Sequence, residues 1–209
     1  MNGRLVILSS PSGTGKTTIA RRILAGREDV AFSISATTRP ARKRERDGVD
    51  YHFLTRDEFV RRRDNGEFLE WAEYRGRFYG TLQADVDALL ASGHHVILDI
   101  EVQGAQQVRA RRSDVVAIFV LPPSGEALLS RLRGRGSENL REVAGRVAQA
   151  GRELEQASSY DHVVVNDVLD QAVAAVEAII DGEASPTLRQ PELNERVEQL
   201  RRELAAMAT

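Results

Sequence analysis

The chain has 209 residues, of which 42% are hydrophobic and 29% charged, and its formal net charge is −2 at pH 7. These values are ordinary for one globular domain and exclude general disorder. The near balance of charge argues against binding to nucleic acid or to an anionic membrane surface, because either partner favours a large excess of basic residues. The absence of cysteine excludes disulfides, thiolate nucleophiles and zinc held by cysteine.

The sequence also gives no sign of a histidine metal site, a membrane span or a signal peptide. The four histidines have no spacing typical of metal ligands. No apolar run approaches the ~20 residues of a membrane-spanning helix, and the first residues reach a turn at Ser10 without the long apolar segment of a signal peptide. We therefore expect a cytoplasmic protein with no membrane and no nucleic-acid partner. Lysine occurs only at Lys16 and Lys43, so a lysine at a chemically demanding position is informative.

The first half of the chain predicts strands and helices around one arginine-rich loop. The expected elements are a buried strand at 5–8, a helix at 17–25, a strand at 31–35, a loop at 38–48, a helix between the capping box 55–58 and Asn65-Gly66, and a hairpin of 68–74 with 77–80.

The second half returns to alternating helices and strands. The expected elements are a helix from 82 to 92, a strand at 95–100, a strand at 115–121, a helix from Ser124 to the 134–136 break, a helix at 140–157, a strand at 163–165 and a helix at 169–180. Strands that alternate with helices of ten or more residues predict an α/β fold with a mainly parallel sheet.

The C-terminal segment predicts a linker and one more helix. Residues 181–191 carry two prolines, a glycine and few apolar residues. Beyond them, apolar residues recur at alternating spacings of four and three, at Leu193, Val197, Leu200, Leu204 and Met207. This helical stripe is only about two heptads long, so packing against its own domain and formation of a homo-oligomer are both open.

The motif with the clearest chemistry lies between the first strand and the first helix. Its sequence, SPSGTGKT, is that of a phosphate-binding P-loop, with Ser10 where the usual pattern begins with glycine. Glycines let successive backbone N–H groups face a polyphosphate, and the helix N-terminus adds partial positive charge. Lys16 would reach the β- and γ-phosphates of ATP, and the Thr17 hydroxyl would bind Mg²⁺. The expected ATP-binding segment comprises Ser10, Pro11, Ser12, Gly13, Thr14, Gly15, Lys16, Thr17 and Thr18.

A P-loop enzyme also needs an acid at the end of a neighbouring buried strand, where it supports the Mg²⁺ shell. Asp99 follows the apolar run 96–98, and Glu101 lies two residues later on the same side of the strand. The expected metal residues are Thr17 and Asp99, partly through water.

Several further segments make the chain resemble guanylate kinases, which pass a phosphoryl group from ATP to GMP. The resemblance covers about residues 3–181 and rests on segments 9–18, 32–39, 48–53, 68–72, 79–81, 98–104, 131–136 and 165–167. It implies a P-loop NTPase fold with a mainly parallel core sheet, a small mixed GMP-binding insertion and a mobile lid. The implied guanylate kinase domain is 1–182, with core 1–36, 84–124 and 151–181, GMP-binding region 37–83 and lid 125–150, followed by a linker and C-terminal helix at 183–209.

The resemblance also implies roles for individual residues. The GMP phosphate would be bound by Arg39, Arg42, Tyr51 and Tyr79, and the guanine would be read by Ser35, Glu70 and Thr81, with Asp99 and Glu101 near the base and the Mg²⁺. The ATP phosphates would be covered by Arg131, Arg135 and Arg146, with Asn166 near the adenine. The implied catalytic set is Lys16, Arg39, Arg135 and Arg146.

The implied reaction is ATP + GMP ⇌ ADP + GDP with Mg²⁺, in the recycling of GMP and dGMP within purine nucleotide metabolism. Two alternatives stay open at this point. One is a related P-loop kinase for another phosphorylated acceptor, and the other is a non-catalytic guanylate-kinase-like module that binds phosphopeptides in the GMP cleft.

Overall fold

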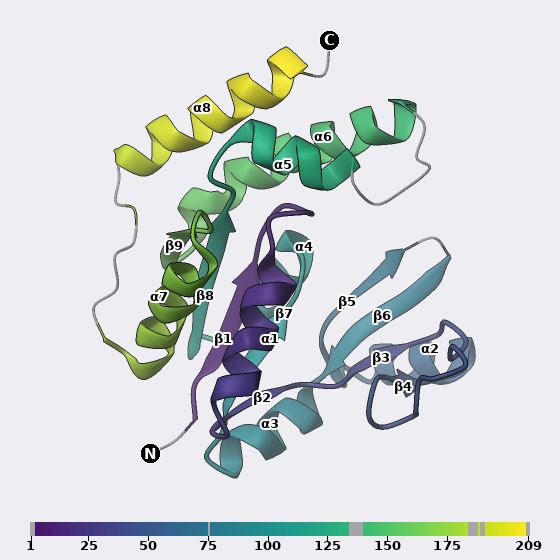
Figure 1. Ribbon diagram of the computed structural model, residues 1–209. Helices are drawn as coiled ribbons and strands as arrows, with labels where there is room; N and C mark the ends of the chain where they lie inside the picture. The colour runs from purple at the N-terminus through teal and green to yellow at the C-terminus, as the bar shows by residue number, and fades with distance from the viewer. Residues whose placement is uncertain (1–2, 75, 134–139, 184–187, 189–190, 208–209) are drawn as a thin grey trace. The chain divides into compact units, whose positions relative to one another are not determined.

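The computed structural model describes residues 3–74, 76–133, 140–183, 188 and 191–207 (Figure 1). The chain forms two compact units. Unit 1 comprises Met1–Val6 and Arg27–Val115, and unit 2 comprises Ile7–Gly26 and Val116–Thr209.

The core sheet has five strands in the order β2-β7-β1-β8-β9. Strand β1 (Leu5–Ser9), whose residues are shared between the units, is buried at every position, as its apolar run predicts. In unit 1, β2 (Val30–Phe32) pairs in parallel with β7 (His95–Asp99). Strand β8 (Val115–Leu121), which belongs to unit 2 apart from Val115, pairs in parallel with β9 (His162–Val165). The predicted α/β fold with a parallel core sheet is confirmed.

Unit 1 also contains a mixed four-stranded sheet in the order β4-β3-β6-β5. Its strands are β3 (Ser35–Thr37), β4 (His52–Phe53), β5 (Phe68–Tyr74) and β6 (Arg77–Leu82). The predicted hairpin is confirmed as β5 and β6, which pair antiparallel, whereas β3 and β4 are parallel. A small mixed sheet thus lies in the region expected at 37–83, with β3 beginning two residues before it.

Three phenylalanines build the core beside this mixed sheet. Phe59, the buried residue of α2 (Arg56–Asp64), stacks on Phe68 of β5 and Phe78 of β6, with ring centroids 4.4 and 5.2 Å apart. The predicted capping box is confirmed, because the Glu58 N–H donates to the Thr55 hydroxyl at 3.1 Å. The stacked rings join α2 to the hairpin, so the hairpin has a fixed support within unit 1.

The expectation of one strand over 31–35 is wrong. Residues 30–32 form β2 of the core sheet, and residues 35–37 form β3 of the mixed sheet. Residues 33 and 34 carry the chain from one sheet to the other, and the alternation of apolar and polar side chains continues across this crossing. Since alternation reports the faces of a strand but not its partners, the pattern cannot show the change of sheet.

The remaining helices follow the predicted order with one addition. They are α1 (Lys16–Gly26), α3 (Gln83–Ala91), α4 (Val102–Arg111), α5 (Gly125–Arg133), α6 (Leu140–Leu154), the 3-10 helix η1 (Glu155–Ser159) and α7 (Leu169–Asp181). Helix α4 is the addition. Its buried residues are Val102, Gly104, Ala105 and Val108, in a glutamine-rich segment without a strong apolar stripe. None of the helices built from the described residues is long and apolar enough to cross a membrane.

The C-terminal helix α8 (Glu192–Met207) lies on the other helices of unit 2, against α5, α6 and η1 (Figure 1). Leu193, Leu200 and Leu204 are buried there, whereas the side chain of Met207 lies outside the described part. Glu203 accepts the backbone N–H of Gly125, the first residue of α5, at 2.6 Å. Three of the five residues of the apolar stripe are therefore covered by the chain's own residues, and Val197 is half-buried.

Replacing Leu200 with alanine should destabilise unit 2, because this side chain is 0% exposed. A buried leucine truncated to alanine typically loses ~3 kcal/mol, which lowers the melting temperature of a protein of this size by about 6–12 °C. Thermal unfolding followed by circular dichroism measures the change. Arg202→Ala, at an exposed position of the same helix, is the control and should melt within about 2 °C of the parent. Equal melting of the two variants would contradict the docking of α8.

Candidate functional site

The P-loop of unit 2 makes a tight turn between β1 and α1. Gly13 and Gly15 have φ of +89° and +98°, a backbone conformation that side-chain-bearing residues rarely adopt. Between them, Thr14 is fully buried and donates both its N–H and its hydroxyl to the carbonyl of Pro11, at 3.2 and 2.8 Å. The loop therefore leads directly into the N-terminus of α1, the position that suits an anion.

Two distant residues meet at the carbonyl oxygen of Thr14. Arg131 of α5 donates to it from Nη1 at 2.9 Å, and Asn166, directly after β9, donates from Nδ2 at 2.8 Å. Asn166 is only 5% exposed. A Cβ on Gly15 would lie 2.5 Å from Asn166 Nδ2, so Gly15 is required both for its φ and for the space it leaves. The structure thus brings two of the expected ATP-site residues to the P-loop.

The other expected ATP-site residues divide into three groups. Lys16 is the first residue of α1 and half-buried, and the side chains of Thr17 and Thr18 are exposed beside it. Arg146 of α6 donates from Nη1 to the carbonyl of Leu132 at 3.1 Å, which ties α6 to the last turn of α5. Arg135 lies outside the described residues.

In unit 1, the expected phosphate residues gather around Arg39. Its guanidinium carbon lies 5.3 Å from the centre of the Tyr51 ring, and the Tyr51 and Tyr79 rings meet edge to face with centroids 6.4 Å apart. Arg42 is exposed, and its backbone N–H donates to Glu45 at 2.7 Å. Three of the four expected side chains are therefore close together.

Glu45 is a site residue that sequence reasoning missed. Its two carboxylate oxygens accept from both terminal nitrogens of Arg39, each at 2.9 Å, a bidentate pair. The hydrogen bond to Arg39 holds the pKa of Glu45 below its ordinary value, and the same hydrogen bond raises the pKa of Arg39. The only sequence feature that could have identified Glu45 is its place as an acid inside an arginine-rich loop. The sequence does not show which arginine it pairs with.

The expected guanine-reading residues lie next to one another in the mixed sheet. Glu70 of β5 is 8% exposed, and its Oε1 accepts the hydroxyl hydrogen of Thr81 on β6 at 2.7 Å. Ser35 of β3 is the direct cross-strand neighbour of Thr81 and is half-buried. A nearly buried carboxylate held by a hydroxyl is suited to binding paired N–H donors of a ligand.

The two expected acids follow β7, also in unit 1. Asp99 is the last residue of that strand and half-buried, and Glu101 is the exposed N-cap of α4, without a hydrogen bond from its side chain to the helix. No group of three or more acids and histidines suited to a metal occurs among residues 3–74, 76–133, 140–183, 188 and 191–207.

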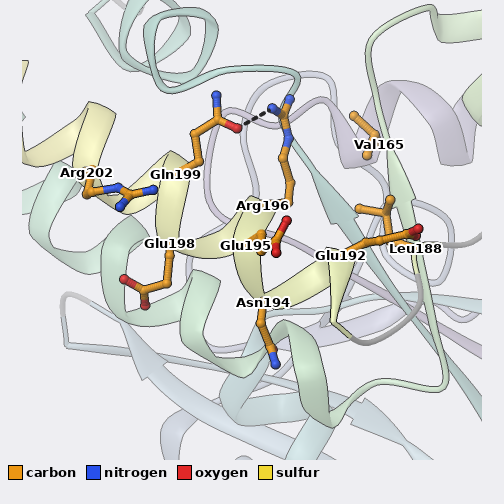
Figure 2. A pocket seen from close by; sticks show the side chains of 9 residues that line it. All are labelled: Val165, Leu188, Glu192, Asn194, Glu195, Arg196, Glu198, Gln199 and Arg202. Atoms are coloured by element: carbon orange, nitrogen blue, oxygen red, sulfur yellow. Dashed lines mark hydrogen bonds between the residues drawn. The ribbon is translucent and has the colours of Figure 1, made fainter.

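A cavity of about 840 Å³ lies elsewhere, along α8, with Val165 and Leu188 at one end (Figure 2). Figure 2 shows that its polar side chains point in different directions, with Arg196 turned to Gln199 and Glu198 turned away from both. None of the expected nucleotide-binding residues lines it. Volume alone therefore does not locate the chemistry of this protein.

Comparison with known proteins gives one consistent result. A family model described as Guanylate kinase matches residues 2–183. The chain is 47% identical over 187 residues to a guanylate kinase of Symbiobacterium thermophilum, which covers 90% of this chain and 89% of that protein. It is 42% identical over 196 residues to a guanylate kinase of Thermotoga maritima, covering 94% of this chain and 95% of that protein.

A solved structure agrees with these sequence comparisons. The crystal structure of guanylate kinase from Anaplasma phagocytophilum is similar with a TM-score of 0.67 and 35% sequence identity, over 94% of each chain. The P-loop, the parallel core sheet and the small mixed sheet agree with these comparisons. The chain therefore belongs to the guanylate kinase family.

Proposed function

We propose that this chain transfers the γ-phosphoryl group of ATP to GMP, and to dGMP as a second acceptor, through the residues described above. The observation that carries the proposal is the buried carboxylate of Glu70, held by Thr81 at 2.7 Å. Guanine presents two adjacent donors, N1–H and the 2-amino group, which one carboxylate accepts together. Adenine presents an acceptor at N1, so a carboxylate in this place would reject it.

The phosphate of GMP would lie against Arg39, Arg42, Tyr51 and Tyr79. Arginine forks suit a phosphate dianion, and phenolic hydroxyls add donors without adding charge. Glu45 keeps the Arg39 guanidinium beside the Tyr51 ring through their hydrogen bonds. The acceptor is already a dianion at neutral pH, so the transfer needs no general base, and catalysis consists of placement and charge neutralisation.

On the ATP side, Lys16 and the backbone N–H groups of the P-loop would hold the β- and γ-phosphates, with Asn166 near the adenine. Arg131 is already hydrogen-bonded to the loop, and Arg135 and Arg146 would complete the positive charge over the transferring group. In this proposal the segment 125–150 is the lid, the region 37–83 binds GMP, and 1–36, 84–124 and 151–181 form the core of the guanylate kinase domain 1–182.

Mg²⁺ would be held by the Thr17 hydroxyl and, partly through water, by Asp99. Both are oxygen donors, the kind that Mg²⁺ prefers, and a site with few protein ligands suits an ion that keeps several waters and binds substrate phosphates. When bound, the ion neutralises charge on the phosphates. Thr17 contributes the hydroxyl from the start of α1, and Asp99 contributes the carboxylate from the end of β7.

Cytoplasmic localisation, a role in purine nucleotide metabolism and the absence of nucleic-acid and membrane partners stay predictions from the family and the sequence. Homo-oligomerisation through α8 also stays a prediction, and burial of Leu193, Leu200 and Leu204 within the chain favours a stabilising role in cis.

The proposal is tested by following ADP release with GMP, dGMP, AMP and ribose phosphates as acceptors in parallel. ADP formation that depends on GMP or dGMP supports it. Transfer to AMP or to a ribose phosphate in preference to GMP would favour a related kinase. Binding of GMP without ADP release from any acceptor would favour a non-catalytic module.

Lys16→Ala should lower turnover by roughly 10³-fold, about 4 kcal/mol of transition-state stabilisation, because the lysine charge acts on the transferring phosphoryl group. Steady-state ADP release and a thermal unfolding curve measure activity and folding together. Lys43→Ala removes the only other lysine, which is exposed, and serves as the control. A folded Lys16→Ala protein with near-normal turnover would rule out this role.

Glu70→Gln should reduce the preference for GMP over AMP by ~1–3 kcal/mol, because an amide offers one acceptor and one donor where guanine requires two acceptors. The measurement is kcat/KM for both acceptors. Glu73→Gln makes the same chemical change at an exposed position of β5 and should leave the preference unaltered. Unchanged discrimination in Glu70→Gln would mean that the base is read elsewhere.

A further inference from the structure

The side of Glu70 opposite its hydrogen bond faces a glycine. Thr81 holds Oε1, while Gly104, the third residue of α4, lies against Oε2. A Cβ on Gly104 would lie 2.8 Å from Oε2, 3.3 Å from Cδ and 3.4 Å from Cγ of Glu70. At a separation under 3.0 Å something must shift, and the atom nearest to this Cβ is the end of a flexible side chain, so a side chain at this position displaces the Glu70 carboxylate.

Helix α4 is anchored where it meets the sheet. The Gln107 side chain accepts the Trp71 N–H at 3.1 Å and donates to the Trp71 carbonyl at 2.9 Å, as a neighbouring strand would. Arg111 donates to the carbonyl of Phe68 at 2.6 Å. Moving α4 away from β5 would break these three hydrogen bonds, so the Glu70 side chain is the part that must give way.

Gly80 of β6, which also lies beside β5, is required for a different reason. A Cβ on Gly80 of β6 would lie 2.8 Å from the backbone carbonyl oxygen of Glu70 and 2.8 Å from Cδ1 of the buried Phe68. A side chain at Gly80 would therefore damage the sheet and its core. At Gly104, in contrast, the atoms nearest to the added Cβ all belong to the Glu70 side chain.

Backbone conformation does not explain Gly104 either. The residue lies inside an α-helix and is not among the glycines with positive φ, so alanine can adopt its conformation. In such a place alanine is the better helix former. What the glycine supplies here is space for the carboxylate.

We propose that Gly104 is a specificity-determining residue, which by having no side chain lets the Glu70 carboxylate stay where guanine is read. The inference rests on the proposed GMP-phosphorylating function and deepens it. It adds a residue that touches the carboxylate rather than the substrate, and it explains why a glycine stands in a helix that would be more stable without it.

The first test is Gly104→Ala. The KM for GMP should rise about tenfold or more, with kcat changed less than about threefold, because the lost contact to the base acts equally in ground and transition states. The preference for GMP over AMP should fall by a similar factor. The melting temperature should stay within about 4 °C of the parent, because the helix gains what the displaced carboxylate loses.

The control is Gly151→Ala in α6, where a Cβ would meet nothing within 4 Å. This variant should leave the KM for GMP and the KM for AMP unchanged, and its melting temperature should equal or exceed that of the parent. Glu70→Asp alone shortens the carboxylate by one methylene and should weaken GMP binding. In the double variant, which combines Gly104→Ala with Glu70→Asp, the shorter carboxylate also avoids the added Cβ. The rise in the KM for GMP should therefore be smaller than the product of the two single effects.

Three results would overturn the inference: an unchanged KM for GMP and unchanged preference in Gly104→Ala, a collapse of its melting temperature, or multiplicative effects in the double variant. Failure of the function itself has another signature, since the parent chain would then release no GMP-dependent ADP. GMP-induced thermal shifts of the parent and of Gly104→Ala give a binding readout that does not depend on turnover.

Discussion

A carboxylate that is nearly buried needs hydrogen-bond partners and room, and in unit 1 Glu70 places both demands on its neighbours. Removing an ionised carboxylate from water costs several kcal/mol unless partners compensate. Thr81 supplies a hydroxyl hydrogen at 2.7 Å, and Gly104 supplies room on the opposite side. The pairing of β5 with β6 is irregular between Phe68 and Glu70, directly beside the carboxylate. The mixed sheet, its aromatic support from Phe59 and the anchored helix α4 can all be understood as the means of holding this one group.

Unit 2 is organised around a backbone oxygen instead. The Thr14 carbonyl binds Arg131 and Asn166, so residues separated by more than a hundred positions are fixed to the P-loop by the protein itself. Preorganised donors and charges act on a reaction without having to rearrange during it. Helix α8 contributes to this arrangement, because Glu203 accepts the N–H of Gly125 at the start of α5, the helix that carries Arg131. Both units thus position charged groups through hydrogen bonds within the protein itself.

Much of this fold could be predicted because buried strands and amphipathic helices leave short-range patterns that end at glycine, proline or a capping residue. The prediction failed where the sequence carries no such pattern. The alternation at 31–35 continues across a change of sheet, so it does not mark the end of β2. The buried face of α4 consists of small and weakly apolar residues between glutamines, so it does not form a recognisable apolar stripe. The site residues came from a family resemblance, and their partners did not. The pairing of Glu45 with Arg39 and the role of the Thr14 carbonyl depend on three-dimensional proximity, since backbone acceptors look alike in every sequence.

The central claim is that the Glu70 carboxylate accepts two adjacent donors of guanine. The most direct measurement compares kcat/KM for GMP with that for inosine monophosphate, which is the same nucleotide without the 2-amino group, on the unmodified chain. Loss of one hydrogen bond to a charged, nearly buried acceptor is worth ~1.5–3 kcal/mol, so GMP should be preferred by at least about tenfold. Equal kcat/KM for the two nucleotides would contradict the account, because it would show that the 2-amino group is not read.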